Sequence, residues 1–317
     1  MAKTNPFANK LVTIFGGSGF LGNYVAQALF ERGARLRIAS RNPERSFNLK
    51  PLANLGQLQF LRCDIINEGS LAAALEGSDA VVNLVGAFGG GLRQLMGEAP
   101  GAMARLAKAA GVQSFVHVSA IGSDDESEVE YARTKGLGEK AVMANFPKTT
   151  IIRPSVIFGE NDNFINMFAE LIQMLPILPV FGPEAQLQAT FVDDVAEAIA
   201  VALENPGRHG GKTFEVGGPE TLTMLEINHR IAAAQGRKRY FIPMPDGASS
   251  FFAALPGTPM SRDQWALLRE GNVASGERPG YKQLGIEPRP LGLFLDKWMM
   301  CYRKHGRFTP VAGPSAA

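Results

Sequence analysis

Cysteine is scarce in this chain of 317 residues, which contains only Cys63 and Cys301. Two distant cysteines form no disulfide framework, and without a CxxC pair or neighbouring histidines they lack the spacing of a structural zinc site. The four histidines are scattered as well, so we expect no metal site. This cysteine usage favours a reducing compartment.

Long apolar runs are also missing. The longest, residues 171–183, is interrupted by Gln173 and contains three prolines, so it falls short of the ~20 residues that span a bilayer. The basic residues near the N-terminus precede only the short run 11–15, whereas a secretory signal needs about 7–15 apolar residues. We therefore expect no transmembrane helix, no export and a cytoplasmic location.

The chain has little net charge, +2 at neutral pH, which gives no reason to expect a nucleic-acid partner. The charge is nevertheless uneven: residues 1–120 carry 12 basic and 7 acidic groups, residues 121–230 carry 8 and 17, and residues 231–317 carry 12 and 6. No acid follows Asp296, whereas Lys297, Arg303, Lys304 and Arg307 do. This basic C-terminal segment is either a solvated tail or a contact for anionic lipid or an acidic partner.

The first half of the chain alternates short apolar runs with amphipathic stretches. Strands are expected at 11–15, 36–39, 58–63, 80–85, 114–118 and 149–152, and helices at 21–32, 70–76, 101–110 and 130–144. Continuous apolar strands between helices indicate a parallel sheet covered on both faces. The sequence therefore predicts an α/β protein with a Rossmann-type doubly wound parallel sheet in residues 1–154.

The pattern loosens in residues 155–317. Helices are expected at 192–203, 223–234, 263–269 and 291–302, with a strand at 213–216 and a proline-broken apolar stretch at 167–181. We expect a smaller, irregular α/β lobe, interleaved with the first domain, that contacts either a substrate or a protein partner.

A glycine-rich segment follows the first strand and opens the first helix. Gly16 allows a tight turn, Gly19 lets the backbone approach a pyrophosphate, and Gly22 lets the helix pack closely on the strand. A phosphate at this position meets free N–H groups and the positive end of the helix dipole. The motif predicts a dinucleotide site.

The end of the second strand indicates which dinucleotide is bound. Ser40 stands where an NAD site presents a carboxylate, and Arg41 follows it. A guanidinium without a neighbouring acid suits a ribose 2′-phosphate, so we expect NADP(H) rather than NAD(H). The alternative is that Arg41 contacts only solvent or adenine. Asp64, after the third strand, is either a partner for the adenine edge or a helix N-terminal acid.

These motifs resemble those of an atypical or extended short-chain dehydrogenase/reductase over nearly the whole chain. The resemblance rests on the glycine motif, Asp64, the segment 83–86, Tyr131 with Lys135, and Arg153 with Pro154. Segments 153–159, 191–196 and 216–220 are similar to the family of NADPH-binding accessory subunits of respiratory complex I (NADH:ubiquinone oxidoreductase) and bacterial relatives. The resemblance implies that the cofactor site also includes Ser18, Phe20, Leu21, Ile65, Leu84, Val85, Gly86, Ser119, Pro154 and Val156.

Tyr131 and Lys135 are the candidate catalytic pair. Four residues apart on a helix, they share one face, where the ammonium is expected to lower the pKa of the tyrosine for acid/base work. The resembled enzymes add a serine or threonine after the fifth strand, but Ala120 stands there, with Ser119 and Ser123 as possible substitutes. Five acids between Ala120 and Tyr131 further disfavour a tyrosinate. The pair therefore has one of two roles: it holds the cofactor as the remnant of an active site, or it takes part in catalysis.

Three hypotheses follow. The first is an NADP(H)-holding accessory or assembly subunit with little or no turnover, attached to a membrane-bound respiratory complex at the cytoplasmic face of the inner membrane. The second is an NADP-dependent reductase or epimerase acting on an apolar carbonyl or quinone-like substrate, because stretches 167–181 and 241–252 are apolar. The third is a sensor of the NADP(H) ratio.

Overall fold

The structure, a computed structural model, describes residues 5–254 and 262–308. The chain forms two compact units. The first unit comprises Met1–Pro154, Val192–Val216 and Ser275–Glu287, and the second comprises Ser155–Phe191, Gly217–Ala274 and Pro288–Ala317. Two segments from the second half of the chain thus complete the first unit, beyond residues 1–154.

The first unit contains a seven-stranded sheet whose neighbouring strands are all parallel. Its order is β11-β6-β5-β4-β1-β2-β3. The strands are β1 Leu11–Phe15, β2 Arg35–Ser40, β3 Leu58–Arg62, β4 Ala80–Asn83, β5 Ser114–Val118, β6 Thr150–Pro154 and β11 Thr213–Val216. Every residue of β1, β4 and β5 is buried, as expected for strands covered on both faces. The predicted Rossmann-type doubly wound sheet is confirmed.

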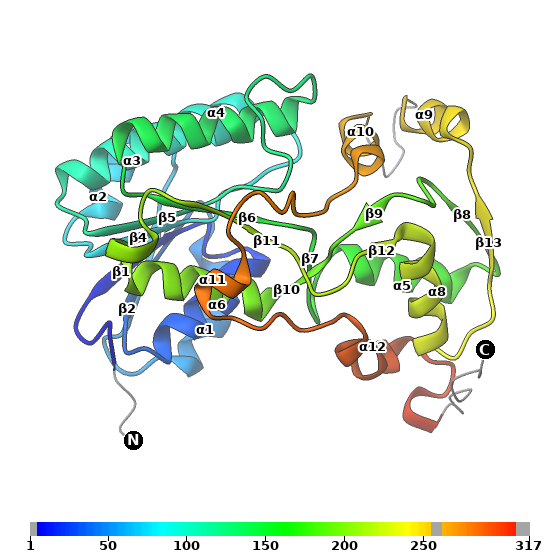
Figure 1. The fold of residues 1–317 in the computed structure, drawn as a ribbon. Helices are drawn as coiled ribbons and strands as arrows, with labels where there is room; N and C mark the ends of the chain where they lie inside the picture. The colour runs from blue at the N-terminus through cyan, green and yellow to red at the C-terminus, as the bar shows by residue number, and fades with distance from the viewer. Residues whose placement is uncertain (1–4, 255–261, 309–317) are drawn as a thin grey trace. The chain divides into compact units, whose positions relative to one another are not determined.

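Helices cover both faces of this sheet (Figure 1). One layer contains α2 Glu68–Leu75, α3 Ala99–Ala109 and α4 Glu130–Asn145; the other contains α1 Phe20–Phe30, α6 Val192–Glu204 and the short α11 Tyr281–Leu284. A 3-10 helix at Pro43–Leu52, a π-helix at Arg93–Glu98 and α7 Pro206–His209 complete the unit. Strand order reverses between β1 and β4, the switch point outside which such folds bind ligands.

A buried ion network joins α4 to two strands of the first unit. Two guanidinium nitrogens of Arg153 on β6, Nε and Nη2, each donate to the Glu139 carboxylate at 2.8 Å. Glu215 on β11 lies 3.6 Å from Arg153 and accepts hydrogen bonds from the N–H and hydroxyl of Ser275 at 2.8 Å. Removing one member of such a network leaves a buried charge without compensation.

The second unit is less regular. Its helices are α5 Phe164–Met174, α8 Met224–Ala234, α9 Asp246–Ala254, α10 Arg262–Glu270 and α12 Gly292–Trp298, with 3-10 turns at Met299–Tyr302 and Gly306–Phe308. Three two-stranded sheets join β7 Ile157–Phe158 to β10 Thr190–Phe191, β9 Gln186–Leu187 to β12 Leu222–Thr223, and β8 Ile177–Val180 to β13 Tyr240–Pro243. A capping box starts α8: the Thr223 hydroxyl accepts from the Glu226 N–H, and the Glu226 carboxylate accepts from the Thr223 N–H.

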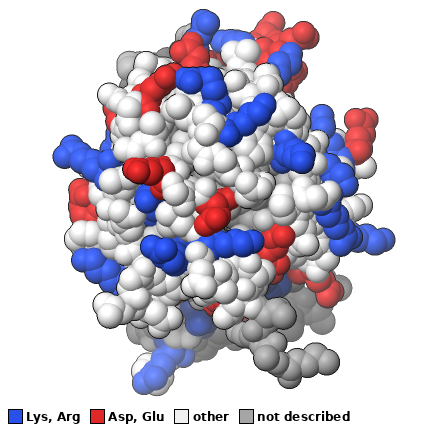
Figure 2. All heavy atoms as spheres, turned by 90° about the vertical axis from the view of Figure 1, so that its left-hand side faces the viewer, with Lys and Arg blue, Asp and Glu red and all other residues white. Residues whose placement is uncertain are grey.

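Charges of both signs are interspersed on the face in Figure 2, without a continuous basic patch. None of the helices in the described ranges is long and apolar enough to cross a membrane.

Candidate nucleotide-binding site

The turn after β1 holds the glycine motif in the geometry that the sequence predicts. Gly16 has a φ of +75°, and a side chain there would stand 3.1 Å from the Leu84 and Val85 backbone. Gly22 in α1 lies against the turn, because an added Cβ would be 2.4 Å from the Gly17 carbonyl oxygen. Both residues are therefore glycines for reasons internal to the fold.

Gly19 differs from these two glycines. It precedes α1 with a φ of −83°, which any residue adopts, and an added Cβ would meet only the Gly16 carbonyl oxygen, at 3.3 Å. The position that a Cβ on Gly19 would take is therefore clear of side chains in the described part of the chain. No side chain caps α1 and no acid lies in its first turn, so the N–H groups and dipole there suit an anion.

Ser40 and Arg41 lie beside this turn at the end of β2. In the parallel pairing of β1 with β2, Phe15 lies opposite Ala39, and the Gly16 N–H donates to the Ala39 carbonyl at 3.1 Å. The Ser40 hydroxyl is buried and has no hydrogen-bond partner within the described chain, as expected where a ligand hydroxyl completes the bonding. Arg41 is exposed next to it. The residues present thus fit the ribose and phosphates of a dinucleotide.

Asp64 and Ile65 follow β3. The Asp64 carboxylate accepts from the Ile66 N–H at 3.2 Å, and Ile65 is buried. Asn67, not Asp64, caps α2 by accepting from the Ser70 N–H. Asp64 is therefore not the N-cap of α2, and its contact with the adenine edge stays a prediction.

The end of β4 lies on the other side of the turn. Register pairs Phe15 with Asn83, whose side chain accepts from the Val85 N–H at 3.0 Å and ends the strand before Leu84. Gly86 follows, and an added Cβ there would lie 3.8 Å from the Lys135 ammonium. Sequence reasoning missed the role of Asn83 in shaping this edge.

Lys135 is buried in α4, and its ammonium donates to the Val118 carbonyl at 3.1 Å. Burial lowers the pKa of Lys135 to about 8, opposed by the Glu139 carboxylate. Tyr131 lies one helical turn earlier. Burial raises the pKa of Tyr131 to about 12, so the expectation that the ammonium lowers this pKa is wrong, because desolvation of the phenolate dominates.

The hydroxyls after β5 are used locally. The Ser123 hydroxyl donates to the Ala120 carbonyl at 2.7 Å and lies 2.9 Å from the Ser119 hydroxyl. Both serines are buried. The loop thus directs the Ser123 hydroxyl to the Ala120 carbonyl, and the replacement of the missing hydroxyl by Ser119 or Ser123 stays a prediction.

The backbone of the acidic loop before α4 packs against that helix, while the side chains of Asp124, Glu126, Glu128 and Glu130 are exposed to solvent. Asp125 forms an ion pair with Lys140, and an added Cβ on Gly136 would lie 2.3 Å from the Asp125 backbone nitrogen. One carboxylate of the run is thus neutralised by the helix.

His117 on β5 is a core residue. Burial and the Lys135 ammonium lower the pKa of His117 to about 3, so the ring is neutral and its Nδ1 accepts from the Asn83 amide at 3.0 Å. Asp194 is buried at the start of α6, where the sequence predicts a helix. No group of histidine, cysteine or acidic side chains in residues 5–254 and 262–308 has the arrangement of a metal site.

Pro154 ends β6 in the first unit, whereas Val156 belongs to the second unit. There the Val156 N–H donates to the Asn272 side-chain oxygen at 2.7 Å, and the Ser155 hydroxyl donates to the same atom. Asn272, which carries no motif in the sequence, therefore shapes the start of the second unit.

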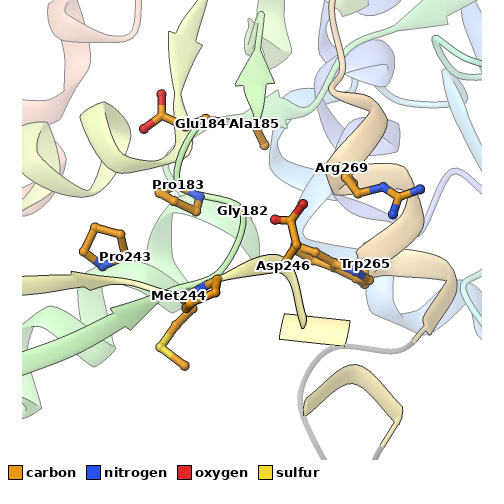
Figure 3. A pocket seen from close by; sticks show the side chains of 10 residues that line it. Gly182, Pro183, Glu184, Ala185, Pro243, Met244, Asp246, Trp265 and Arg269 are labelled. Carbon is orange, nitrogen blue, oxygen red and sulfur yellow. The ribbon is translucent and has the colours of Figure 1, made fainter. Parts of the chain in front are cut away.

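The second unit contains a cavity of about 530 Å³ where β8 and β13 end (Figure 3). Apolar side chains dominate its lining, among them Pro183, Pro243, Met244 and the buried Trp265. Asp246 and Arg269 add charge. The volume lies within the range of small-molecule sites. The side chains of Phe251 and Phe252, in the apolar stretch noted above, lie outside what the structure describes.

The basic C-terminal segment is integrated into the second unit up to Phe308. Trp298 stacks on Phe294 with ring centroids 4.9 Å apart, Met299 is buried, and Arg303 donates to the Ala234 carbonyl at 2.8 Å. Trp298, Met299 and Arg303 are thus anchored, whereas the cations Lys297, Lys304 and Arg307 face solvent, and both interpretations of the segment stay predictions.

Comparisons with known proteins agree with a nucleotide-binding fold. Residues 8–251 match the NmrA-like family. The chain is 33% identical over 294 residues to the rat protein "NADH dehydrogenase [ubiquinone] 1 alpha subcomplex subunit 9, mitochondrial", covering 89% of this chain and 78% of that protein. It is 26% identical to a ceramide reductase of Caulobacter vibrioides, covering 75% of each.

Among solved structures, the NADPH-dependent quinone oxidoreductase QOR2 of Escherichia coli, complexed with NADPH, aligns with a TM-score of 0.72. It shares 19% identity and covers 90% of this chain and 98% of its own. Together with the site geometry, the fold defines an NAD(P)-binding protein of the short-chain dehydrogenase/reductase type. Within that class, the chain belongs to the NmrA-like family.

Proposed function

We propose that the protein holds NADP(H) as a structural ligand and serves as an accessory or assembly subunit of a membrane-bound respiratory NADH:ubiquinone oxidoreductase. The observation that carries the nucleotide part is the clear space over Gly19 beside the unpartnered Ser40 hydroxyl. The partner is inferred from the rat relative, which is named as a subunit of NADH dehydrogenase.

Each side chain of the site has a part in this proposal. The α1 N–H groups bind the pyrophosphate, Ser40 binds the adenosine ribose, and Arg41 pairs with its 2′-phosphate. Asp64 accepts from the adenine amino group, and Lys135 holds the nicotinamide ribose. NADPH, when bound, supplies a hydride at its nicotinamide ring.

The absence of turnover rests on the acid that a carbonyl reduction needs. The pKa of Tyr131, raised to about 12, makes its phenol a poor proton donor near neutral pH. Ala120 offers no hydroxyl to orient a substrate oxygen, and Ser119 and Ser123 bond locally. The nucleotide then stabilises the folded chain by mass action rather than being consumed.

The test is mass spectrometry of nucleotide released from protein purified without added cofactor. We expect NADP(H), retained and not oxidised when aldehydes or quinones are added. Gly19→Asp should lose the nucleotide, whereas Tyr131→Phe should keep both nucleotide and cellular role. Purified protein without nucleotide, or loss of the cellular role in Tyr131→Phe, contradicts the proposal.

The proposed location is cytoplasmic, with peripheral attachment to the cytoplasmic face of the inner membrane. Support comes from an apolar face of the β8–β13 pair, on which Ile177, Tyr240 and Ile242 are exposed, and from the exposed cations Lys304 and Arg307. Not every cation of this segment is available for such a contact, since Arg303 forms an ion pair with Asp296. Recovery in membranes that contain the respiratory complex, and loss of recovery when the complex is absent, would distinguish a protein partner from anionic lipid.

An NADP-dependent reductase for apolar carbonyl or quinone-like compounds is the second candidate. The retained Tyr131 and Lys135 of the first unit favour it. In this case Tyr131 gives its proton to the substrate oxygen. NADPH oxidation with such compounds, abolished by Tyr131→Phe, would establish this candidate instead.

A further inference from the structure

An aromatic side chain covers Tyr131. Phe88, in the loop after β4, stacks on the Tyr131 ring with centroids 4.7 Å apart and planes 9° from parallel. Phe88 is itself 67% exposed, so its ring is held mainly by this one contact. Phe88 thus lies between one face of the Tyr131 ring and solvent.

Both ends of the loop are anchored along α4. At one end Gly86 adjoins the Lys135 ammonium. At the other, Leu92 is buried, and the following π-helix lies so close to α4 that an added Cβ on Gly138 would be 2.0 Å from the Met96 carbonyl oxygen. The loop therefore crosses the helix face that carries Tyr131.

The middle of the loop is free to change conformation. Gly89, Gly90 and Gly91 follow Phe88, and an added Cβ at any of them would have no neighbour within 4 Å. Gly90 and Gly91 have φ values of +67° and +73°. Within the described part of the chain, residues 87–90 make no backbone hydrogen bond. Anchored ends and a glycine centre are the features of a hinged cover.

We propose that Phe88 is a removable cover of Tyr131, which shields the phenol from carbonyl compounds while the nucleotide stays bound. Carbonyl reduction transfers a hydride to the carbonyl carbon and a proton to its oxygen, and the cover denies access to the group that would give the proton. The inference deepens the proposed function, because it explains how a retained tyrosine coexists with unreacted NADPH.

The stacked Phe88 ring adds to the burial of the Tyr131 phenol. A phenol beneath an aromatic ring loses hydration, and burial raises the pKa of Tyr131 to about 12. Phe88 therefore acts through Tyr131, as a positioning residue, and its removal should change the ionisation and accessibility of that phenol.

The experiment compares wild type with Phe88→Ala, with NADPH added. Phe47→Ala is the matched control, because Phe47 is another exposed phenylalanine of the first unit, 46% accessible, that packs on Phe60 and not on Tyr131. Nitration of tyrosines by tetranitromethane is followed peptide by peptide, with Tyr240, which is 78% exposed, as the internal reference. Ultraviolet difference titration against Tyr131→Phe isolates the ionisation of Tyr131.

We expect nitration of Tyr131 to be slower than that of Tyr240 in wild type and to rise about 2- to 12-fold in Phe88→Ala, the factor that one aromatic pair of typical strength provides. The pKa of Tyr131 should fall from about 12 towards 10. Phe88→Tyr, which keeps the stacking ring, should restore both values, and Phe47→Ala should change neither.

Equal nitration and titration of Tyr131 in wild type and Phe88→Ala would overturn the inference. So would wild-type nitration of Tyr131 as fast as that of Tyr240. Nucleotide retention is measured in parallel, because loss of NADPH from wild type contradicts the proposed function but leaves the cover testable in the free protein. If Phe88→Ala unfolds, Phe88→Leu provides the same comparison with an aliphatic side chain.

Discussion

Gly19 and Gly22 belong to one motif, but they should respond in opposite ways to the addition of one methyl group. In Gly22→Ala the new Cβ would stand 2.4 Å from the Gly17 carbonyl oxygen. Because both atoms are fixed directly to the backbone, this clash is relieved only if α1 moves. We expect a loss of about 3 kcal/mol or more in the free energy of unfolding, at the upper end for overpacking.

In Gly19→Ala the new Cβ meets only the Gly16 carbonyl oxygen at 3.3 Å, with an ordinary φ of −83°. We expect the nucleotide-free protein to change by no more than about 1 kcal/mol, the usual difference between glycine and alanine at a helix N-cap. The methyl group nevertheless occupies the space assigned to the pyrophosphate, so the nucleotide should no longer bind.

The assay is thermal unfolding with and without NADPH. At 100 times the dissociation constant a ligand adds about 2.7 kcal/mol, which is roughly 5–10 °C at about 2–4 °C per kcal/mol. Wild type should show this shift. Gly19→Ala should show none despite a near-normal melting temperature without ligand, and Gly22→Ala should melt early in either case. An unchanged NADPH shift in Gly19→Ala would refute the assignment of the pyrophosphate position.

Three further predictions concern other parts of the first unit. Arg41→Ala should weaken NADPH binding about tenfold to hundredfold, because one charge-assisted hydrogen bond is lost, and it should leave NADH binding unchanged in fluorescence titrations. An equal loss of affinity for NADPH and NADH would show that Arg41 does not bind the 2′-phosphate. Arg153→Met should lower the urea-derived free energy of unfolding by about 3–5 kcal/mol, because it leaves the buried Glu139 carboxylate without its ion-pair partner, while Glu215 keeps Arg278. Arg105→Met, which breaks an exposed pair, should cost less than about 1 kcal/mol. The pKa of His117 is lowered to about 3 in the folded chain, so the unfolded chain binds more protons below pH 6.5 and stability should fall by up to about 2 kcal/mol between pH 6.5 and pH 5; His117→Asn should flatten this slope in denaturant titrations at both pH values.

The sheet could be predicted from the sequence because its strands are short apolar runs between helices. The strands Leu11–Phe15 and Ser114–Val118 begin and end at the predicted residues. Prediction failed where side chains override the pattern: β4 ends at Asn83 rather than at 85 because the Asn83 side chain takes the Val85 N–H. The two-residue strands of the second unit depend on tertiary pairing and carry no periodic pattern of their own.

The candidate site was partly readable in the same way. The turn at Gly16, Gly19 and Gly22 is a local motif, and its geometry follows from the residues. The pKa of Tyr131 and the local use of Ser123 depend on contacts that spacing does not encode. The sequence marks Phe88 only as an aromatic residue beside three consecutive glycines. Its contact with the Tyr131 ring is visible only in the structure.

The sheet order has a consequence for synthesis of the chain. The edge strand β11 and helix α6 come from residues 192–216, and residues 275–287 supply Ser275, which bonds Glu215. A ribosome must therefore translate the chain through Glu287 before the nucleotide-binding unit can close. Until β11 is available, β6 presents an open edge, and the nascent chain has to be protected from pairing with its neighbours.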